Sequence, residues 1–171
     1  MSFFKFCPNC ASKNFGFENN RRFKCFDCNM VYFHNVAAAV AVIIERGGEI
    51  LFTVRNREPK KGMLDLPGGF TDPDETAEKT CARELKEELD LNIPPSNFRY
   101  FKSQPNDYLY KGIPYKTEDL VFVTKFPEDA ELKIEKSEIE SVKWIKKSEI
   151  NIEEIGFDSL QKAVEDYLSR P

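Results

Sequence analysis

The stretch that decides the fold is GFTDPDETAEKTCARELKEELDL, residues 69–91. It opens as a glycine-led acidic loop, and the pattern predicts a helix from Asp74 to Leu89. Acidic residues at this start suit the positive N-terminal end of a helix dipole. Apolar residues recur every four positions and form the buried stripe of an amphipathic helix: Ala77, Cys81, Leu85 and Leu89.

Three glutamates, Glu84, Glu87 and Glu88, follow one another at i, i+3 and i+4 on the opposite side of this helix. That spacing gathers three carboxylates on one face, where they repel one another unless cations stand between them. Mg²⁺ and Mn²⁺ require such oxygen-rich groups, above all when the ion also holds substrate phosphates. Charge pattern alone favours a solvated face instead, because Lys79 and Lys86 supply opposite charges nearby.

Four of the five cysteines form two C-x-x-C pairs that are fourteen residues apart: Cys7, Cys10, Cys25 and Cys28. Two such pairs are typical of a zinc ribbon, in which each pair presents two thiolates to a tetrahedral ion. Redox motifs or disulfides are the alternatives, but no secretory signal precedes the pairs. We therefore predict structural zinc in a ribbon spanning residues 1–34, which is too short to fold without a metal.

Composition narrows the function classes. The 171 residues have 41% hydrophobic and 32% charged side chains, which excludes a collagen-like or fully disordered chain. The longest apolar run, residues 36–44, is shorter than the roughly 20 residues that span a bilayer, so we expect a cytoplasmic protein without a membrane partner. The net charge of −4 disfavours nucleic acid as a partner, although basic residues in the ribbon leave that contact open. A single histidine makes a carboxylate the expected general base.

Strand-like runs flank the helix. Residues 36–45 and 49–55 precede it around an Arg46-Gly47-Gly48 turn, and residues 98–104, 115–126 and 138–145 follow it. Residues 156–169 carry apolar side chains at helical spacing and predict a closing helix. We predict an α+β fold over residues 35–171: an α/β/α sandwich in which two helices cover a mixed sheet. Basic residues after the second strand could touch phosphates or form a solvated loop: Arg55, Arg57, Lys60 and Lys61.

The full spacing of the opening stretch carries a family resemblance. It resembles the Nudix box, whose pattern is G-x5-E-x7-R-E-U-x-E-E-x-G-U. Here Gly69 is followed after five residues by Glu75, and after seven more by the run Arg83-Glu84-Leu85-Lys86-Glu87-Glu88-Leu89-Asp90-Leu91. Asp90 departs from it, in place of the glycine that often ends the helix in a left-handed conformation. Aspartate tolerates this conformation better than most residues, so the expected stability cost is modest.

The resemblance implies hydrolysis of a diphosphate within a nucleoside diphosphate linked to another group, with Mg²⁺ or Mn²⁺. It implies that Glu84 and Glu88 are metal ligands, with Glu87 a further ligand or base. The Gly69 carbonyl would join the metal shell, and Arg83 and Glu75 would brace the loop against the helix. These roles are physically coherent, because cations neutralise the diphosphate and lower the pKa of a bound water that attacks phosphorus.

A four-cysteine ribbon directly before a Nudix domain resembles the NADH pyrophosphatase branch. Ser103-Gln104-Pro105 stands where that branch has S-Q-P-W, and Glu138 stands six residues before Trp144, as the branch requires. This alignment implies that Glu138 is a late metal ligand or a water-activating base, although a charged strand edge is the alternative. Asn106 replaces the tryptophan of the branch motif, which leaves the substrate open.

Several functions therefore remain after sequence analysis. The first is a diphosphatase of a dinucleotide such as NADH, of ADP-ribose or of a nucleotide sugar. Its partner would then be a small molecule, and the sequence leaves open whether the chain forms a homodimer. The others are cleavage of a nucleotide cap from RNA and a nucleotide-sensing regulatory module. The intact set of glutamates favours catalysis. Three tyrosines could stack on a base, although aromatics in a sheet more often pack: Tyr108, Tyr110 and Tyr115.

Overall fold

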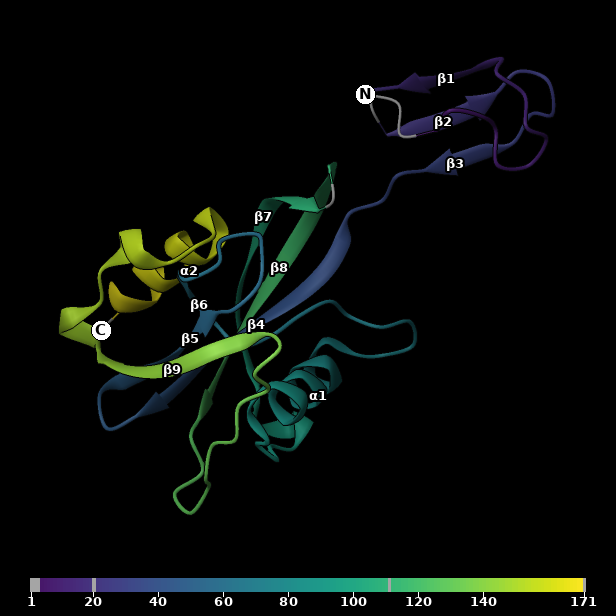
Figure 1. The fold of residues 1–171 in the computed structure, drawn as a ribbon. Helices are drawn as coiled ribbons and strands as arrows, with labels where there is room; N and C mark the ends of the chain where they lie inside the picture. Colours follow the sequence, from purple (N-terminus) through teal and green to yellow (C-terminus); the bar gives the residue numbers. More distant parts are fainter. Residues whose placement is uncertain (1–3, 20, 111, 171) are drawn as a thin grey trace.

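The computed structural model describes residues 4–19, 21–110 and 112–170 (Figure 1). A small antiparallel sheet comes first, with strands β1 (Phe15–Glu18), β2 (Arg22–Cys25) and β3 (Val31–Phe33) in that order. Phe23 and Cys25 are fully buried between its strands and the cysteine loops. In Figure 1 this sheet lies apart from the main body and is connected to it through the segment that leads from β3 to β4.

The main sheet has the spatial order β6-β5-β4-β8-β7, with β9 on the free side of β5. Its strands are β4 (Ala37–Arg46), β5 (Glu49–Arg55), β6 (Leu64–Asp65), β7 (Arg99–Tyr110), β8 (Ile113–Lys125) and β9 (Ile139–Lys146). The central pair, β4 and β8, is parallel, whereas the other pairs are antiparallel. The predicted mixed sheet is therefore confirmed.

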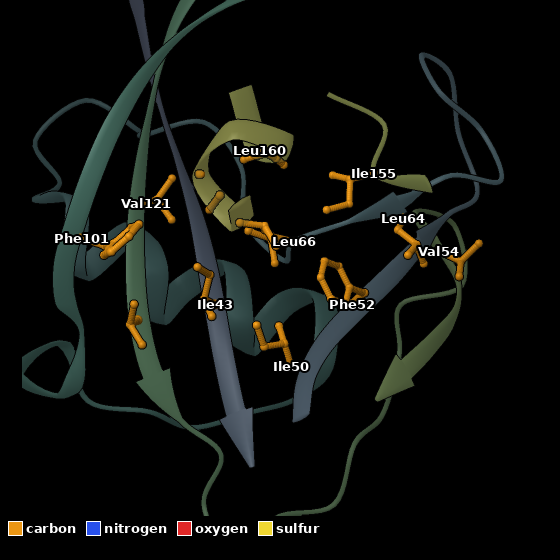
Figure 2. Close-up of a cluster of buried hydrophobic side chains, with 14 residues drawn as sticks. Ile43, Ile50, Phe52, Val54, Leu64, Leu66, Phe101, Val121, Ile155 and Leu160 are labelled. Carbon is orange, nitrogen blue, oxygen red and sulfur yellow. The ribbon is translucent and has the colours of Figure 1, made fainter. Parts of the chain in front are cut away.

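Two helices cover the two faces of this sheet. Helix α1 (Ala77–Leu89) packs its apolar stripe on the face that carries Val40, Val42 and Ile44 of β4. Helix α2 (Asp158–Leu168) covers the other face, where Figure 2 shows Ile43, Val121 and Leu160 in one cluster. Successive residues of a strand point to opposite faces, which is why one apolar run in β4 fills both layers. Three short 3₁₀ turns complete the chain: Pro95–Asn97, Lys147–Glu149 and Ile152–Glu154.

Strands β4 and β5 stay paired only near their turn, from Ile44↔Leu51 to Arg46↔Glu49. Beyond this point β5 diverges, and the chain between β6 and α1 takes its place beside β4. Val42 N–H donates to the Pro67 carbonyl at 2.9 Å, and Val40 N–H donates to the Gly69 carbonyl at 2.8 Å. The glycine-led loop is thus held against the centre of the sheet.

The predicted boundaries differ most from the structure in two places. Helix α1 begins three residues after Asp74, whose φ of 71° is left-handed, and the Thr76 hydroxyl caps the helix by accepting from Lys79 N–H. The expected loop between residues 104 and 115 is a continuation of β7 and β8, which pair up to Tyr110↔Ile113. Pro105 is compatible with this because β7 is an edge strand, where a missing N–H breaks no ladder.

Among the described residues, no helix has both the length and the apolar character needed to cross a membrane.

The end of α1 generates a stability prediction. Asp90 adopts φ 57° and ψ 24°, and its N–H donates to the Lys86 carbonyl at 3.1 Å. We expect Asp90→Gly to be at least as stable as the wild type, because glycine enters the left-handed region without steric cost. Asp90→Val should lose about 1–2 kcal/mol of unfolding free energy, because a β-branched residue is strained there. Urea denaturation of the three proteins decides this, and equal stability of the two variants would contradict the expected left-handed cap.

Candidate active site

A cavity of about 390 Å³ opens where β5 diverges from β4. Its walls include residues of β4, of β5 and the basic loop after it, of β6 and the glycine-led loop after it, of α1, of the β7–β8 pair, of the segment before β9 and of the start of α2. The three glutamates of α1, the two loop glycines and Glu138 therefore border one space, although they are up to 70 positions apart in the sequence.

Arg83 connects the loop to the helix. Its Nε lies 3.1 Å and 3.2 Å from the two carboxylate oxygens of Glu75, and its Nη2 donates to the Phe70 carbonyl at 3.0 Å. The Arg83 guanidinium, with the Thr80 hydroxyl, lowers the pKa of Glu75 below its usual range. This ion pair fixes both ends of the loop that precedes α1.

The same guanidinium also faces the helix glutamates. Arg83 Nη1 lies 2.7 Å from Glu84 Oε1 and 3.1 Å from Glu87 Oε2. Glu84 is pressed against the backbone of Gly69, where a Cβ atom would lie 2.5 Å from Glu84 Oε1. A side chain at residue 69 would therefore displace the Glu84 carboxylate from its present position. Burial raises the pKa of Glu84, and the neighbouring Arg83 opposes that rise.

Glu88 is the most buried carboxylate of α1. Its Oε2 accepts from Gly68 N–H at 3.0 Å. Burial raises its pKa well above the ordinary glutamate value, and the nearby carboxylates of Glu84, Asp65 and Glu138 raise it further. Buried carboxylates that face one another are destabilised as anions unless a cation joins them, so this donor set suits a hard divalent ion. The Gly69 carbonyl already accepts from Val40, and its second lone pair remains compatible with a metal contact.

Glu138 lies immediately before β9 and borders the same cavity. Both of its oxygens are paired with the Arg57 guanidinium, at 2.6 Å for Nη2 and 2.7 Å for Nη1. Its backbone carbonyl accepts from Asn56 N–H at 2.8 Å, so the basic loop and the start of β9 are fixed to each other.

For the four basic residues of this loop the sequence left phosphate contact and a solvated loop both open, and the structure places two of them at the cavity. Arg55 and Arg57 both line the cavity, whereas Lys60 and Lys61 do not. Arg55 is mostly buried and lies 2.5 Å from Asp65 Oδ2. Burial raises the pKa of Asp65, and the adjacent Arg55 opposes the rise. The sequence held one signal for this part of the site, the charged residue Asp65 between the apolar residues Leu64 and Leu66.

Of the other cavity residues, Tyr108 had base stacking as one of its two interpretations, and the rest had no predicted role in the site. They come from β7, β8 and α2, and they include Asn106, Tyr108, Thr117, Asp119 and Phe157. Asp119 is 7% exposed. Its one signal in the sequence was a charged residue directly before an apolar run, because charged residues are seldom buried without a partner or a function.

The four cysteines of the small sheet form a separate cluster. Their Sγ atoms all lie within 4.8 Å of one another, and within the described residues no other group of three or more potential metal ligands meets that limit. Cys7 and Cys28 are 3.7 Å apart, and Cys10 and Cys25 are 3.6 Å apart. A tetrahedral ion with bonds of about 2.3 Å requires sulfur separations of about 3.8 Å, so the four thiols fit zinc.

A model of the NUDIX domain matches residues 34–166. The chain belongs to the Nudix family. The matched range covers the main sheet, α1, the cavity and all but the last two residues of α2, and the four-cysteine cluster precedes it.

Two relatives and one solved structure show which known proteins this chain is similar to. A protein named NAD-capped RNA hydrolase NudC from Vibrio atlanticus is 35% identical over 101 residues, which is 59% of this chain and 36% of the relative. A protein of the same name from Vibrio vulnificus is 29% identical over 140 residues, covering 82% of this chain and 50% of that one. The chain thus spans half or less of the length of these two relatives. A crystal structure of a NUDIX hydrolase from Nitrosomonas europaea has a TM-score of 0.73 at 22% identity, covers 96% of this chain and 90% of that one, and shows the shared fold.

The cysteine cluster generates a metal prediction. Freshly purified protein should contain about one zinc ion per chain, and Cys25→Ser should lose it because three thiolates complete no tetrahedral shell. Elemental analysis and hydrogen exchange across β1–β3 measure the metal and the accompanying unfolding. Cys81→Ala is the matched control, since Cys81 is buried in the Nudix domain away from the cluster. A zinc-free wild type, or a disulfide between Cys7 and Cys10, would contradict the prediction.

Glu88 generates a prediction on pH and stability in the presence of EDTA. Because its pKa is raised in the folded state, Glu88 favours folding at acidic pH, and that contribution is lost as pH rises through the folded-state pKa. Glu88→Gln should therefore raise Tm at pH 8 and leave it nearly unchanged at pH 4. Calorimetry at both pH values measures this, and Glu165→Gln, at an exposed position of α2, should change neither. A lower Tm for Glu88→Gln at pH 8 would refute the buried-charge argument.

Proposed function

We propose that this chain is a Mg²⁺- or Mn²⁺-dependent diphosphatase of small nucleoside diphosphate derivatives. The observation that supports it best is the set of three glutamates held at one cavity wall: Arg83 contacts Glu84 and Glu87, and Gly68 donates to Glu88. A sensing module would have no need for three carboxylates at this position. The glutamates therefore favour hydrolysis over nucleotide sensing.

The metal-binding residues we propose are Glu84, Glu87, Glu88 and Glu138, with the carbonyl of Gly69. When bound, the divalent cations would neutralise the diphosphate and lower the pKa of the attacking water. Mg²⁺ and Mn²⁺ prefer carboxylate and carbonyl oxygens, which are the donors that these residues offer.

The protein groups divide the remaining work. Arg83 and Glu75 hold the loop so that the Gly69 backbone faces Glu84. Glu87 or Glu138 accepts the proton of the attacking water as it bonds to phosphorus, and the diphosphate oxygen leaves on the opposite side. Arg57 is half exposed beside Glu138, so it can orient that carboxylate or bind a substrate phosphate.

We further propose that the chain is divided into the zinc ribbon of residues 1–34 and a catalytic domain of residues 35–171. The zinc would be structural, because four thiolates leave no open coordination position. Four reduced thiols suit a reducing compartment, which supports a cytoplasmic location.

The substrate class is the finer part of the proposal. We expect several nucleoside diphosphate derivatives to be cleaved, including NADH, ADP-ribose and nucleotide sugars. Hydrolysis of an NAD cap on RNA is the second candidate, because the relatives from Vibrio carry that name. The chemical step would be the same on a longer substrate.

The metal site is tested by one substitution. Glu88→Gln should lower kcat by several powers of ten with Mg²⁺ or Mn²⁺ while the circular dichroism spectrum stays unchanged, because a ligand charge is lost but the side-chain volume is kept. Glu165→Gln is the control and should keep wild-type turnover. Near-normal activity of purified Glu88→Gln protein would refute the assignment.

Substrate range is tested by comparing kcat/KM for NADH, ADP-ribose, a nucleotide sugar and NAD-capped RNA. We expect NADH to be accepted with less than a hundredfold preference over ADP-ribose, because Asn106 replaces an aromatic residue. Stacking of a ring on an aromatic side chain is worth about 1–3 kcal/mol, or roughly tenfold to a hundredfold. A larger preference would show that another aromatic residue takes over the stacking, and tight binding without turnover would support the sensing alternative.

A further inference from the structure

The far end of the cavity lies on the α2 face of the sheet, beyond the glutamates. There β4 contributes only small side chains at alternate positions, Ala39 and Ala41. The partner of Ala39 across the β4–β8 pair is Asp119, and Thr117 lies two residues before it on the same face. The alanines leave room above the sheet, and β8 provides polar groups at the edge of that room.

Asp119 is a buried carboxylate with a fixed orientation. Its Oδ2 accepts from the Ser159 hydroxyl at 2.6 Å, and its Oδ1 accepts from the Thr117 hydroxyl at 3.0 Å. Ser159 belongs to the first turn of α2, and both hydroxyl residues are buried. The Asn106 side chain provides a third hydrogen bond, and because a carboxylate has about four acceptor positions, these three bonds leave about one for a group in the cavity that Asp119 borders.

The proposed metal site does not include this carboxylate. Burial raises the pKa of Asp119, and hydrogen bonds from Ser159, Thr117 and Asn106 partly offset that rise. On the same face of β8, the next two positions are the buried apolar residues Val121 and Val123. An apolar residue would serve packing alone at lower cost, since burying a charge is unfavourable without strong partners.

Three aromatic side chains share this cavity with Asp119. Tyr108 packs edge-to-face on Phe70 with ring centroids 5.6 Å apart, and it lies 6.0 Å from the ring of Phe157. These three rings line the same cavity as Asp119. A second cavity of about 670 Å³ adjoins it and is lined by Phe70, Tyr108, Tyr110 and Tyr115. Flat aromatic walls next to a hydrogen-bond acceptor suit a flat ring with an N–H group at its edge.

We propose that Asp119 is a specificity-determining residue that accepts a hydrogen bond from an exocyclic NH₂ group on one ring of the substrate, while Tyr108 contacts the face of that ring. This rests on the proposed function, because the ring belongs to the nucleotide derivative that is cleaved. The group would be the amino group of adenine or the carboxamide of nicotinamide. A ring with an oxygen in that place would set an acceptor against the carboxylate, which leaves both unpaired and weakens binding.

The test compares NADH with two analogues that change one ring each. One analogue has hypoxanthine in place of adenine, and the other has a carboxylate in place of the nicotinamide carboxamide. For the wild type, kcat/KM of one analogue should be at least tenfold below that of NADH, and that analogue identifies which ring contacts Asp119. The decisive ratio is kcat/KM for NADH divided by kcat/KM for that analogue. Asp119→Asn, whose amide can donate as well as accept a hydrogen bond, should bring this ratio to within threefold of one.

Two further variants separate recognition from folding. Glu118→Gln removes the neighbouring charge from the opposite face of β8 and should keep the wild-type ratio. Ser159→Ala breaks the connection between α2 and β8 but keeps the carboxylate, so its Tm should fall while the ratio stays above fivefold. If Asp119 served only to anchor α2, Ser159→Ala would change the ratio as much as Asp119→Asn does.

Equal use of NADH and both analogues by the wild type, or an unchanged ratio in Asp119→Asn, would overturn the inference while leaving the diphosphatase intact. Absence of hydrolysis of every compound would instead overturn the proposed function. In that case equilibrium dialysis of the same three compounds with Mg²⁺ decides the inference, since the acceptor should still bind NADH at least tenfold more tightly than one analogue.

Discussion

The ion pair between Arg83 and Glu75 is the interaction on which the site depends. One guanidinium holds the Glu75 carboxylate and the Phe70 carbonyl on the loop side, and it contacts Glu84 and Glu87 on the helix side. Without this positive charge, the loop would lose its attachment and the carboxylates would repel one another. A bidentate, planar group is needed here, and lysine could not replace it because its ammonium offers no such fork.

The second constraint is the divergence of β4 and β5. Their pairing ends after Leu51, and the glycine-led loop pairs with β4 in place of β5. This arrangement brings the backbone of Gly68 and Gly69 to the sheet centre, where a side chain at residue 68 would collide with the Val40 carbonyl at 2.1 Å. The loop glycines are therefore requirements of close backbone approach, and they let the carboxylates of α1 reach the cavity from the other side of the sheet.

The two candidate metal sites differ in their physical design. The four thiols are preset at separations that match a tetrahedral ion, in a sheet whose own apolar core consists of a few aromatic side chains. The carboxylates are held by Arg83 and by the Gly68 N–H, in a domain with two large apolar clusters. In the small sheet a metal would supply folding free energy, whereas in the main domain packing supplies it and the carboxylates are available for chemistry.

Much of this protein could be predicted from local sequence. The helix that ends at Leu89, the cysteine spacing and the box positions depend on short-range periodicity and on residue types with few alternative uses, so they could be predicted without a fold, although the helix begins at Ala77 rather than at Asp74. The β7–β8 extension past residue 104 was missed, because only its edge position makes Pro105 compatible with a strand. The sequence could not place Arg55, Asp65 or Asp119 at the cavity, since they come from three separate strands and meet only through tertiary pairing. Distance along the chain carries no information on such contacts, and the sheet topology alone decides them.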